Sequence, residues 1–488
     1  MNPTSNNVVP IIPEIFMTVM ALVILLTGVF AEHGRKVTFY LAQCTLVVTL
    51  VLTLFTFVEF DFKQVVLTFH NSFVLDPLAV ILKVFILIAV FFTFLYSRLY
   101  NEFRKISANE FYVLGLLSTI GMMILVSSHN LLTIFLGVEL LSLPTYAMVA
   151  MRQKENRCVE AAMKYFIIGA LATGMLLYGF SMIFGATQSL DIREIADHFA
   201  LNPIGSNNIA IFGLVFAVAG LAFKLGAAPF HMWVPDVYDG APSSVTLFIS
   251  TAPKIAGFGM MIRLLVGALP ALQVQWQEML IVLSLLSMGL GNFAAIVQSN
   301  LKRMLAYSSI AHAGYMLLGV ICATPRGYAA SLFYTITYTI MTLGAFGIIV
   351  LMNRAGIEVE NIDDFRGLNN RHPWLAFIML MVMFSLAGVP PLVGFIAKVG
   401  LLEALIRVHL VWLAVLAILF AIIGAYYYLH VVKVMYFERP TETASVKDDL
   451  RVSTGSLVAI TLNGIAVLLL GVLPGTLFTL CHFAFSVI

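Results

Sequence analysis

The chain has 488 residues, of which 61% are hydrophobic and only 11% are charged, and its formal net charge is +2. A soluble domain carries about 25% charged residues, because water must meet a charged surface. The deficit of charge runs along the whole chain. The composition therefore excludes a soluble enzyme, a disordered chain and a nucleic-acid-binding protein, and it places the chain in a lipid bilayer.

The four cysteines lie far apart and form no C-x-x-C pair, so the sequence predicts neither a metal cluster nor a disulfide framework. The first ten residues contain no Lys or Arg, which a cleavable signal peptide would need. We therefore expect the first apolar stretch to be a retained membrane helix.

Long apolar runs follow one another along the chain, each close to the length of about 20 residues that a membrane-spanning helix needs. Continuous runs, as opposed to alternation of apolar and polar residues, favour helices over a β-barrel. In chain order the runs predict fourteen spans: 10–30, 37–58, 74–97, 110–127, 129–150, 158–184, 207–230, 241–265, 276–298, 303–323, 327–353, 372–404, 409–437 and 455–485. The predicted fold class is an all-α polytopic membrane protein.

The basic residues between these spans are divided unevenly between the two sides of the membrane. Seventeen Lys and Arg residues follow odd-numbered spans, and five follow even-numbered spans. Since basic loops stay in the cytoplasm, the count predicts that both termini lie outside the cytoplasm.

Five lysines fall inside predicted spans, together with one central carboxylate, Glu139. A charge at mid-bilayer costs about 2.5–3.5 kcal/mol on insertion scales. A long lysine stem can avoid this cost by extending to the headgroups, and we favour that interpretation for Lys83 and leave it open for Lys164. The more central Lys224, Lys254 and Lys398 and the carboxylate of Glu139 are expected to be functional.

Proton relay is the chemistry that such residues suggest. An ammonium whose carboxylate partner approaches or withdraws can take up and release a proton near neutral pH. Glu139 and Lys164 stand on consecutive antiparallel helices and are predicted to form such a pair. Other side chains could also carry protons, namely His231, His312, His430, Tyr307 and Tyr426 to Tyr428. Each of these is a weak signal by itself, because a buried histidine is more often a hydrogen-bonded core residue.

Two spans carry glycine and proline beside their lysine. Lys224 is followed by Gly226, Pro229 and Pro235, and the string SLAGVPPLVGFIAKVG precedes and includes Lys398. Proline removes a backbone donor and clashes with the preceding turn, so both helices should break. Freed backbone at membrane depth persists only where protein or water satisfies it.

The two broken spans, 7 and 12, are five apart and so cross the membrane in opposite directions. Paired interruptions of this kind indicate inverted repeats. We predict helices 1–3 in residues 1–109, a first five-helix repeat in 110–266, a second in 267–437, and a cytoplasmic loop with helix 14 in 438–488.

Several strings carry a family resemblance. FLGVELLSLPTYAMVA, EAAMKYFIIGA, LAFKLGAAPFHMWVPDVYDGAP, NLKRMLAYSSIAHAGYMLLG and SLAGVPPLVGFIAKVG, spread over 110–437, resemble the proton-translocating antiporter-like subunits of respiratory complex I, the NADH:quinone oxidoreductase. The resemblance implies that Glu139 and Lys164 form the paired glutamate and lysine of helices 5 and 6. It also implies that Lys224 is the lysine of broken helix 7 and that Lys254 is a connecting lysine on helix 8.

The same resemblance assigns Lys398 to broken helix 12, leading towards the outer face, and His312 to helix 10 near the centre of the path. It implies no cofactor in this chain, with NADH, FMN, iron–sulfur clusters and quinone in partner subunits. The implied partners are other membrane subunits of complex I, including further antiporter-like subunits, and the lipid bilayer.

Three alternatives stay open at this stage. The chain is either a proton-conducting subunit of a redox-driven pump, a subunit of a multi-subunit cation/proton antiporter, or a structural subunit whose charges hold helices in register. An intramembrane hydrolase has little support, because neither an H-E-x-x-H nor a G-x-S-x-G string occurs.

Overall fold

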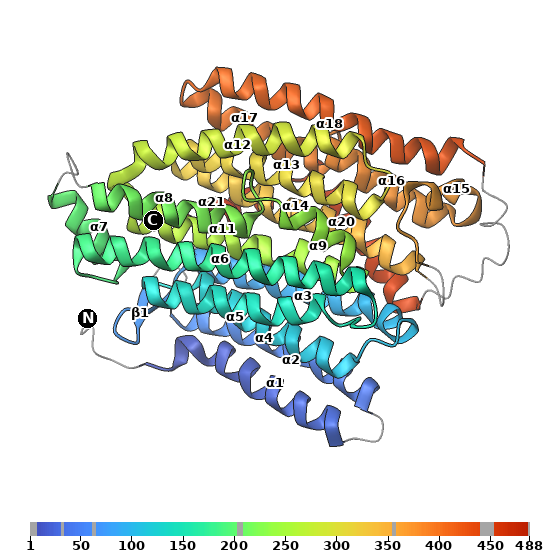
Figure 1. The fold of residues 1–488 in the computed structure, drawn as a ribbon, viewed down its shortest axis with the longest axis horizontal. Coiled ribbons are helices and arrows are strands. Elements are labelled where there is room, and N and C mark those ends of the chain that lie inside the picture. The colour runs from blue at the N-terminus through green and yellow to red at the C-terminus, as the bar shows by residue number, and fades with distance from the viewer. Residues whose placement is uncertain are drawn as a thin grey trace.

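The computed structural model describes residues 7–30, 34–60, 65–202, 208–353, 358–439 and 453–486, apart from the side chains of Gly34 and Arg35. Helices run side by side along the long axis of the molecule (Figure 1). Within the described residues, thirteen helices are long and apolar enough to cross a membrane. The all-α polytopic class is therefore confirmed.

The N-terminal part begins at one edge of the bundle with α1 and α2 and reaches the interior with α3. It consists of a 3-10 turn (Val9–Ile11), α1 (Ile12–Phe30), α2 (Gly34–Glu59), the strands β1 (Val66–Thr68) and β2 (Phe73–Leu75), and α3 (Pro77–Phe103). The two strands form an antiparallel hairpin that the apolar runs did not predict. Asp76 starts α3 by accepting a hydrogen bond from the Ala79 amide at 2.8 Å, and Pro77 occupies the first turn, where no amide donor is needed.

The middle of the chain supplies the predicted first repeat. Its helices are α4 (Ala108–Val126), α5 (Leu131–Val149), α6 (Asn156–Thr187), α7 (Ile192–Leu201), α8 (Asn208–Leu225), α9 (Trp233–Gly240), α10 (Ser243–Ser250), α11 (Ala252–Met261) and the π-helix η2 (Ile262–Ala268). The predicted span 241–265 is thus interrupted at Thr251, whose backbone leaves the helical region ahead of Pro253.

The C-terminal part continues the bundle. After a 3-10 turn (Pro270–Leu272) come α12 (Gln273–Ile296), α13 (Leu301–Ile321), α14 (Pro325–Met352), a 3-10 turn η4 (Ile362–Phe365), α15 (Leu368–Arg371), α16 (Pro373–Ala387), α17 (Val393–Arg407), α18 (Val411–Phe437), α20 (Thr454–Val472) and α21 (Gly475–Ala484). The predicted spans 372–404 and 455–485 are each two helices. Proline lies between the helices of both pairs, as Pro390 and Pro391 in one and as Pro474 in the other.

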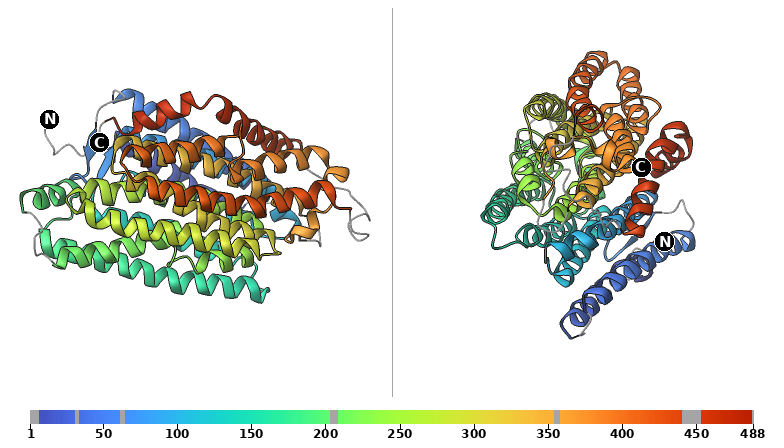
Figure 2. Two further views of the ribbon diagram at one scale, coloured as in Figure 1. Left: turned by 90° about the horizontal axis from the view of Figure 1, so that it is seen from above. Right: turned by 90° about the vertical axis from the view of Figure 1, so that its right-hand side faces the viewer.

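The centre of the bundle is formed by α10–η2, α13 and α14, which are almost wholly buried, whereas α1, α2, α18 and α20 expose much of their apolar surface. Figure 2 shows α1 and α2 at the opposite side of the bundle from α17 and α18. The start of α1 and the end of α21 lie towards the same end of the molecule (Figures 1 and 2).

Candidate functional site

The first predicted break lies beside Lys224 and is present. Helix α8 ends at Leu225, Gly226 adopts a left-handed φ of 72°, and α9 begins at Trp233. The freed backbone is satisfied by protein groups, because the indole of Trp233 donates to the Phe223 carbonyl at 3.0 Å and the Ala228 amide donates to the Ser287 hydroxyl at 2.8 Å. The break therefore lies inside the bundle and is stabilised there by hydrogen bonds to protein groups.

Lys224 points from the end of α8 towards α5. Its ammonium donates to the hydroxyl of Ser142 and lies 6.0 Å from the centre of the Tyr146 ring. Ser142 follows Glu139 by three residues, so both share one face of α5. Glu139 interacts electrostatically with Lys224. The structure thus places Glu139 within electrostatic range of Lys224, although no ion pair within 4 Å joins these two described residues.

Lys164 does not pair with Glu139 in this structure. Its ammonium contacts Asp236 at 2.9 Å and Glu160 at 2.8 Å, and the side chain is 42% exposed. The antiparallel register explains the difference. The Tyr146 ring packs against Tyr165, the neighbour of Lys164, at 4.6 Å. Glu139 lies seven residues before Tyr146, about 10 Å further along α5.

Lys254, on a neighbouring helix, caps the C-terminal end of α8. It is buried on α11, and its ammonium donates to the Leu225 carbonyl at 2.6 Å. Leu225 directly follows Lys224, so the two lysines meet at one broken helix end. Lys254 lies in the first turn of α11, directly after the interruption at Thr251.

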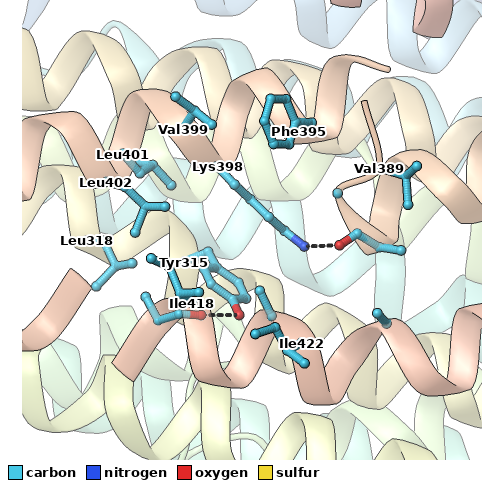
Figure 3. Close-up of a pocket in the computed structure, with 15 residues that line it drawn as sticks. Tyr315, Leu318, Val389, Phe395, Lys398, Val399, Leu401, Leu402, Ile418 and Ile422 are labelled. Carbon is cyan, nitrogen blue, oxygen red and sulfur yellow. Dashed lines mark hydrogen bonds between the residues drawn. The ribbon is translucent and has the colours of Figure 1, made fainter. Parts of the chain in front are cut away.

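The second predicted break is also present. Helix α16 ends at Ala387, Gly388 has a left-handed φ of 91°, and α17 begins at Val393. The ammonium of Lys398 reaches back from α17 to the carbonyls of Leu386 at 3.0 Å and Ala387 at 2.9 Å. It lies in a largely apolar pocket of about 430 Å³ between α16, α17 and α18 (Figure 3).

His312 lies on α13, held between two phenols. Its Nδ1 is 2.7 Å from the Tyr334 hydroxyl and its Nε2 is 3.0 Å from the Tyr428 hydroxyl, which in turn contacts Ser308. Tyr315 connects this cluster to the second break, because its ring lies 6.1 Å from that of His312 and 5.4 Å from the Lys398 ammonium.

The weaker candidate residues differ in how far they are buried. Tyr427 is buried and donates to Asn292 at 3.0 Å, whereas Tyr426 and His430 are exposed on the outer face of α18. His231 is buried within the first break, and Tyr307 is partly buried on α13.

The interpretation of Lys83 as a residue that extends to the headgroups is wrong. Lys83 is 1% exposed, and its ammonium contacts the carboxylate of Glu14, on the first turn of α1, at 2.6 Å. Sequence spacing within α3 does not reveal a partner on another helix. A second buried pair was also missed: Arg263 binds both oxygens of Asp76, at 2.6 and 2.7 Å.

Among the residues that the structure describes, no three His, Cys, Asp or Glu side chains gather as a set of metal ligands. The six predicted site residues lie in three groups: Glu139 with Lys224 and Lys254 at the first break, Lys398 and His312 around Tyr315, and Lys164 beside Asp236 and Glu160.

Comparisons with known proteins agree on one family. Residues 128–424 match the family described as NADH:quinone oxidoreductase/Mrp antiporter, TM. The chain is 65% identical over 480 residues to NADH-quinone oxidoreductase subunit N of Coxiella burnetii, covering 98% of this chain and 99% of that one.

Solved structures agree on the fold. A chain of respiratory complex I from Thermus thermophilus with bound aureothin is 31% identical, with a TM-score of 0.81 over 96% of this chain and 99% of that one. A chain of the Mrp complex from Dietzia sp. DQ12-45-1b has a TM-score of 0.85 at 19% identity, over 97% and 96%, and shows the shared fold.

The string ELLSLP from Glu139 and the lysine of the second break resemble subunit N more than the related antiporter-like subunits, and the names of the relatives agree with this. The chain therefore belongs to the NADH:quinone oxidoreductase/Mrp antiporter family of membrane proteins, in its NADH-quinone oxidoreductase subunit N branch.

Proposed function

We propose that the chain conducts protons across the bacterial inner membrane as a multi-pass subunit of NADH-quinone oxidoreductase, driven by quinone reduction in other subunits. The 65% identity to a subunit N over nearly the whole chain supports this assignment. The single observation that carries the mechanism is the contact of Lys224 with Ser142, one turn from Glu139, at a break whose backbone is satisfied inside the bundle.

The relay has two parts. In the first, the Lys224 ammonium exchanges its proton under the control of Glu139, and Lys254 holds the end of the same helix. In the second, His312 and Lys398 act on either side of Tyr315. A phenol both donates and accepts hydrogen bonds, so Tyr334 and Tyr428 can pass a proton to or from either imidazole nitrogen without turning the ring.

Internal similarity supports the division into two five-helix repeats at 110–266 and 267–437. Isolated bridges join Asn130 to Asp191 and Asn300 to Asn361, and each bridge connects residues 61 positions apart. Both Asn130 and Asn300 cap the helix that follows. Gly121 in α4 and Gly291 in α12 are 170 positions apart, and each allows its helix to approach the following helix closely. With the same offset of 170 positions, His312 in the second repeat corresponds to Ser142 in the first.

We expect fourteen membrane crossings, with α16 and α17 together making one of them, and both termini on the periplasmic side. An even number of crossings agrees with the placement of the start of α1 and the end of α21 (Figure 1). Flavin, iron–sulfur clusters and the sites for NADH and quinone are expected in partner subunits. This chain is expected to contain no redox centre and to act as a subunit of the whole complex, a proton-translocating NADH:quinone oxidoreductase (translocase).

A cation/proton antiporter subunit is the second candidate, because the matched family includes Mrp antiporters. The Mrp chain, at 19% identity, shares the fold only. We favour the quinone-reductase complex because relatives above 47% identity carry the subunit N name.

The test is Glu139→Gln in the assembled complex in inverted membrane vesicles. We expect assembly to persist, while proton pumping and the NADH oxidation coupled to it fall. Glu403→Gln is the matched control, since that carboxylate is half exposed and bound to Arg326 and Arg407. If Glu139→Gln pumps as well as the control, the proposed relay is wrong.

A further inference from the structure

A polar pocket of about 250 Å³ lies between α6, α9 and the start of α13. Its lining residues, all but one charged, are Arg157, Glu160, Ala161, Lys164, Asp236, Asp239 and Arg303. Water in the liquid occupies about 30 Å³ per molecule, so the pocket has room for several waters with many polar partners. Its chemistry is the opposite of the apolar pocket around Lys398.

Asp236 is the central group of this pocket. One carboxylate oxygen contacts the Lys164 ammonium at 2.9 Å, and the other contacts Arg303 at 3.2 Å. Arg303 belongs to the second predicted repeat and Lys164 to the first. If Lys164 moves away, Arg303 still holds Asp236, and Lys164 keeps Glu160 as an alternative partner at 2.8 Å.

Two residues close in sequence to the lining of this pocket form an aromatic stack. Tyr165 follows Lys164 in α6, and its ring stacks on that of Trp233 with 4.7 Å between centres and 14° between planes. Both rings line the small cavity that contains Lys224. Trp233 begins α9, the helix that carries Asp236. Lys164 and Asp236 line the polar pocket, and their neighbours Tyr165 and Trp233 line the Lys224 cavity, so the stacked pair links the two cavities through the same two helices.

We propose that this pocket is the water-filled mouth through which protons reach the first relay, with Asp236 as its proton-collecting carboxylate. The inference rests on the proposed function. Lys164 releases Asp236, and the carboxylate binds a proton from water. When the Tyr165–Trp233 stack parts, the neutral acid gives that proton through water to the unprotonated amine of Lys224. Asp236 returns to a carboxylate, Lys224 becomes an ammonium, and Lys164 binds Asp236 again.

The main test is Asp236→Asn in the assembled complex. A positioned proton-transfer group contributes about 100-fold or more. Glu160 remains as a second acceptor, so we expect coupled NADH oxidation and proton uptake to fall by about tenfold, below that range. Asp363→Asn is the control, because Asp363 is exposed and paired with Arg366 in η4. Its rates should not change. An Asp236→Asn complex that assembles and turns over normally would overturn the proposal.

A second measurement decides the matter if Asp236→Asn does not assemble. In a Cys44→Ser background, Glu160→Cys is treated with a bulky, membrane-impermeant cationic thiol reagent. Slower turnover than in the equally treated Cys44→Ser complex supports a water-accessible mouth, and unchanged turnover rejects it. The two proposals fail separately. If Glu139→Gln loses pumping while Asp236→Asn turns over normally and treated Glu160→Cys is not slowed, only the proposed mouth is rejected. If Glu139→Gln pumps normally, the relay itself is rejected.

Discussion

The buried pair of Lys83 and Glu14 gives the sharpest prediction about stability. The two side chains are 1% and 3% exposed, with 2.6 Å between Nζ and Oε1. At that separation Coulomb attraction is about 6 kcal/mol for an effective dielectric constant of about 20. Desolvation offsets part of it, and removing one partner of a buried pair typically costs about 3–5 kcal/mol. Lys83→Met leaves the Glu14 carboxylate without that partner.

Lys83→Met is therefore expected to be more harmful than removing both charges. In Glu14→Gln/Lys83→Met no buried charge is left unpaired, and replacing both partners is often nearly neutral. The assay is a double-mutant cycle on the purified complex, following its thermal midpoint and the amount of chain retained. We expect a low midpoint and yield for each single variant and values near the original for the double variant. Additive losses would show that the two charges are not coupled.

Two further predictions concern packing and pH. Gly121→Leu should abolish assembly, because a Cβ at Gly121 would meet the Leu141 backbone nitrogen at 2.3 Å. Gly174→Leu is the control and should assemble normally, because Gly174 has open space around it. The amount of the chain in the purified complex measures both outcomes. Burial raises the pKa of Glu358, but Lys302, Arg104 and Arg152 outweigh it and hold the pKa below its usual 4.5. The contribution of Glu358 to stability is therefore complete above pH 4.5 and is lost as the pH falls through the lowered value. Hydrogen exchange of residues 358–361, corrected for intrinsic pH dependence, should rise on acidification and lose this response in Glu358→Gln; an unchanged response would contradict the assignment.

The sequence predicted the fold class well, because span length and continuous hydrophobicity are local properties. It also located both breaks, since Gly and Pro beside Lys224 and Lys398 act on the backbone where they stand. It missed the interruption at Thr251, although Pro253 was a signal of the same kind. A single proline among apolar residues did not distinguish a break from an uninterrupted helix.

Partner choice was the part that the sequence could not predict. Glu139 and Lys164 were paired because their helices are consecutive, but the register of α5 against α6 sets Lys164 beside Asp236, 72 residues away. Lys83 lacked a partner within its own helix, and Glu14 lies on α1. Such contacts depend on rotation and register between helices, which hydrophobic periodicity in a membrane leaves undetermined, because lipid-facing and protein-facing surfaces are both apolar.

The central claim is that protons move through the charged groups at the first break. Lys224→Met tests it most directly, because methionine keeps much of the side-chain volume and removes the proton-carrying amine. Proton uptake and NADH oxidation are measured together in vesicles containing the assembled complex, with Lys433→Met as the control, since Lys433 is 65% exposed on α18. The account predicts that Lys224→Met assembles and loses coupled pumping while Lys433→Met keeps it. Equal pumping by the two variants would contradict it.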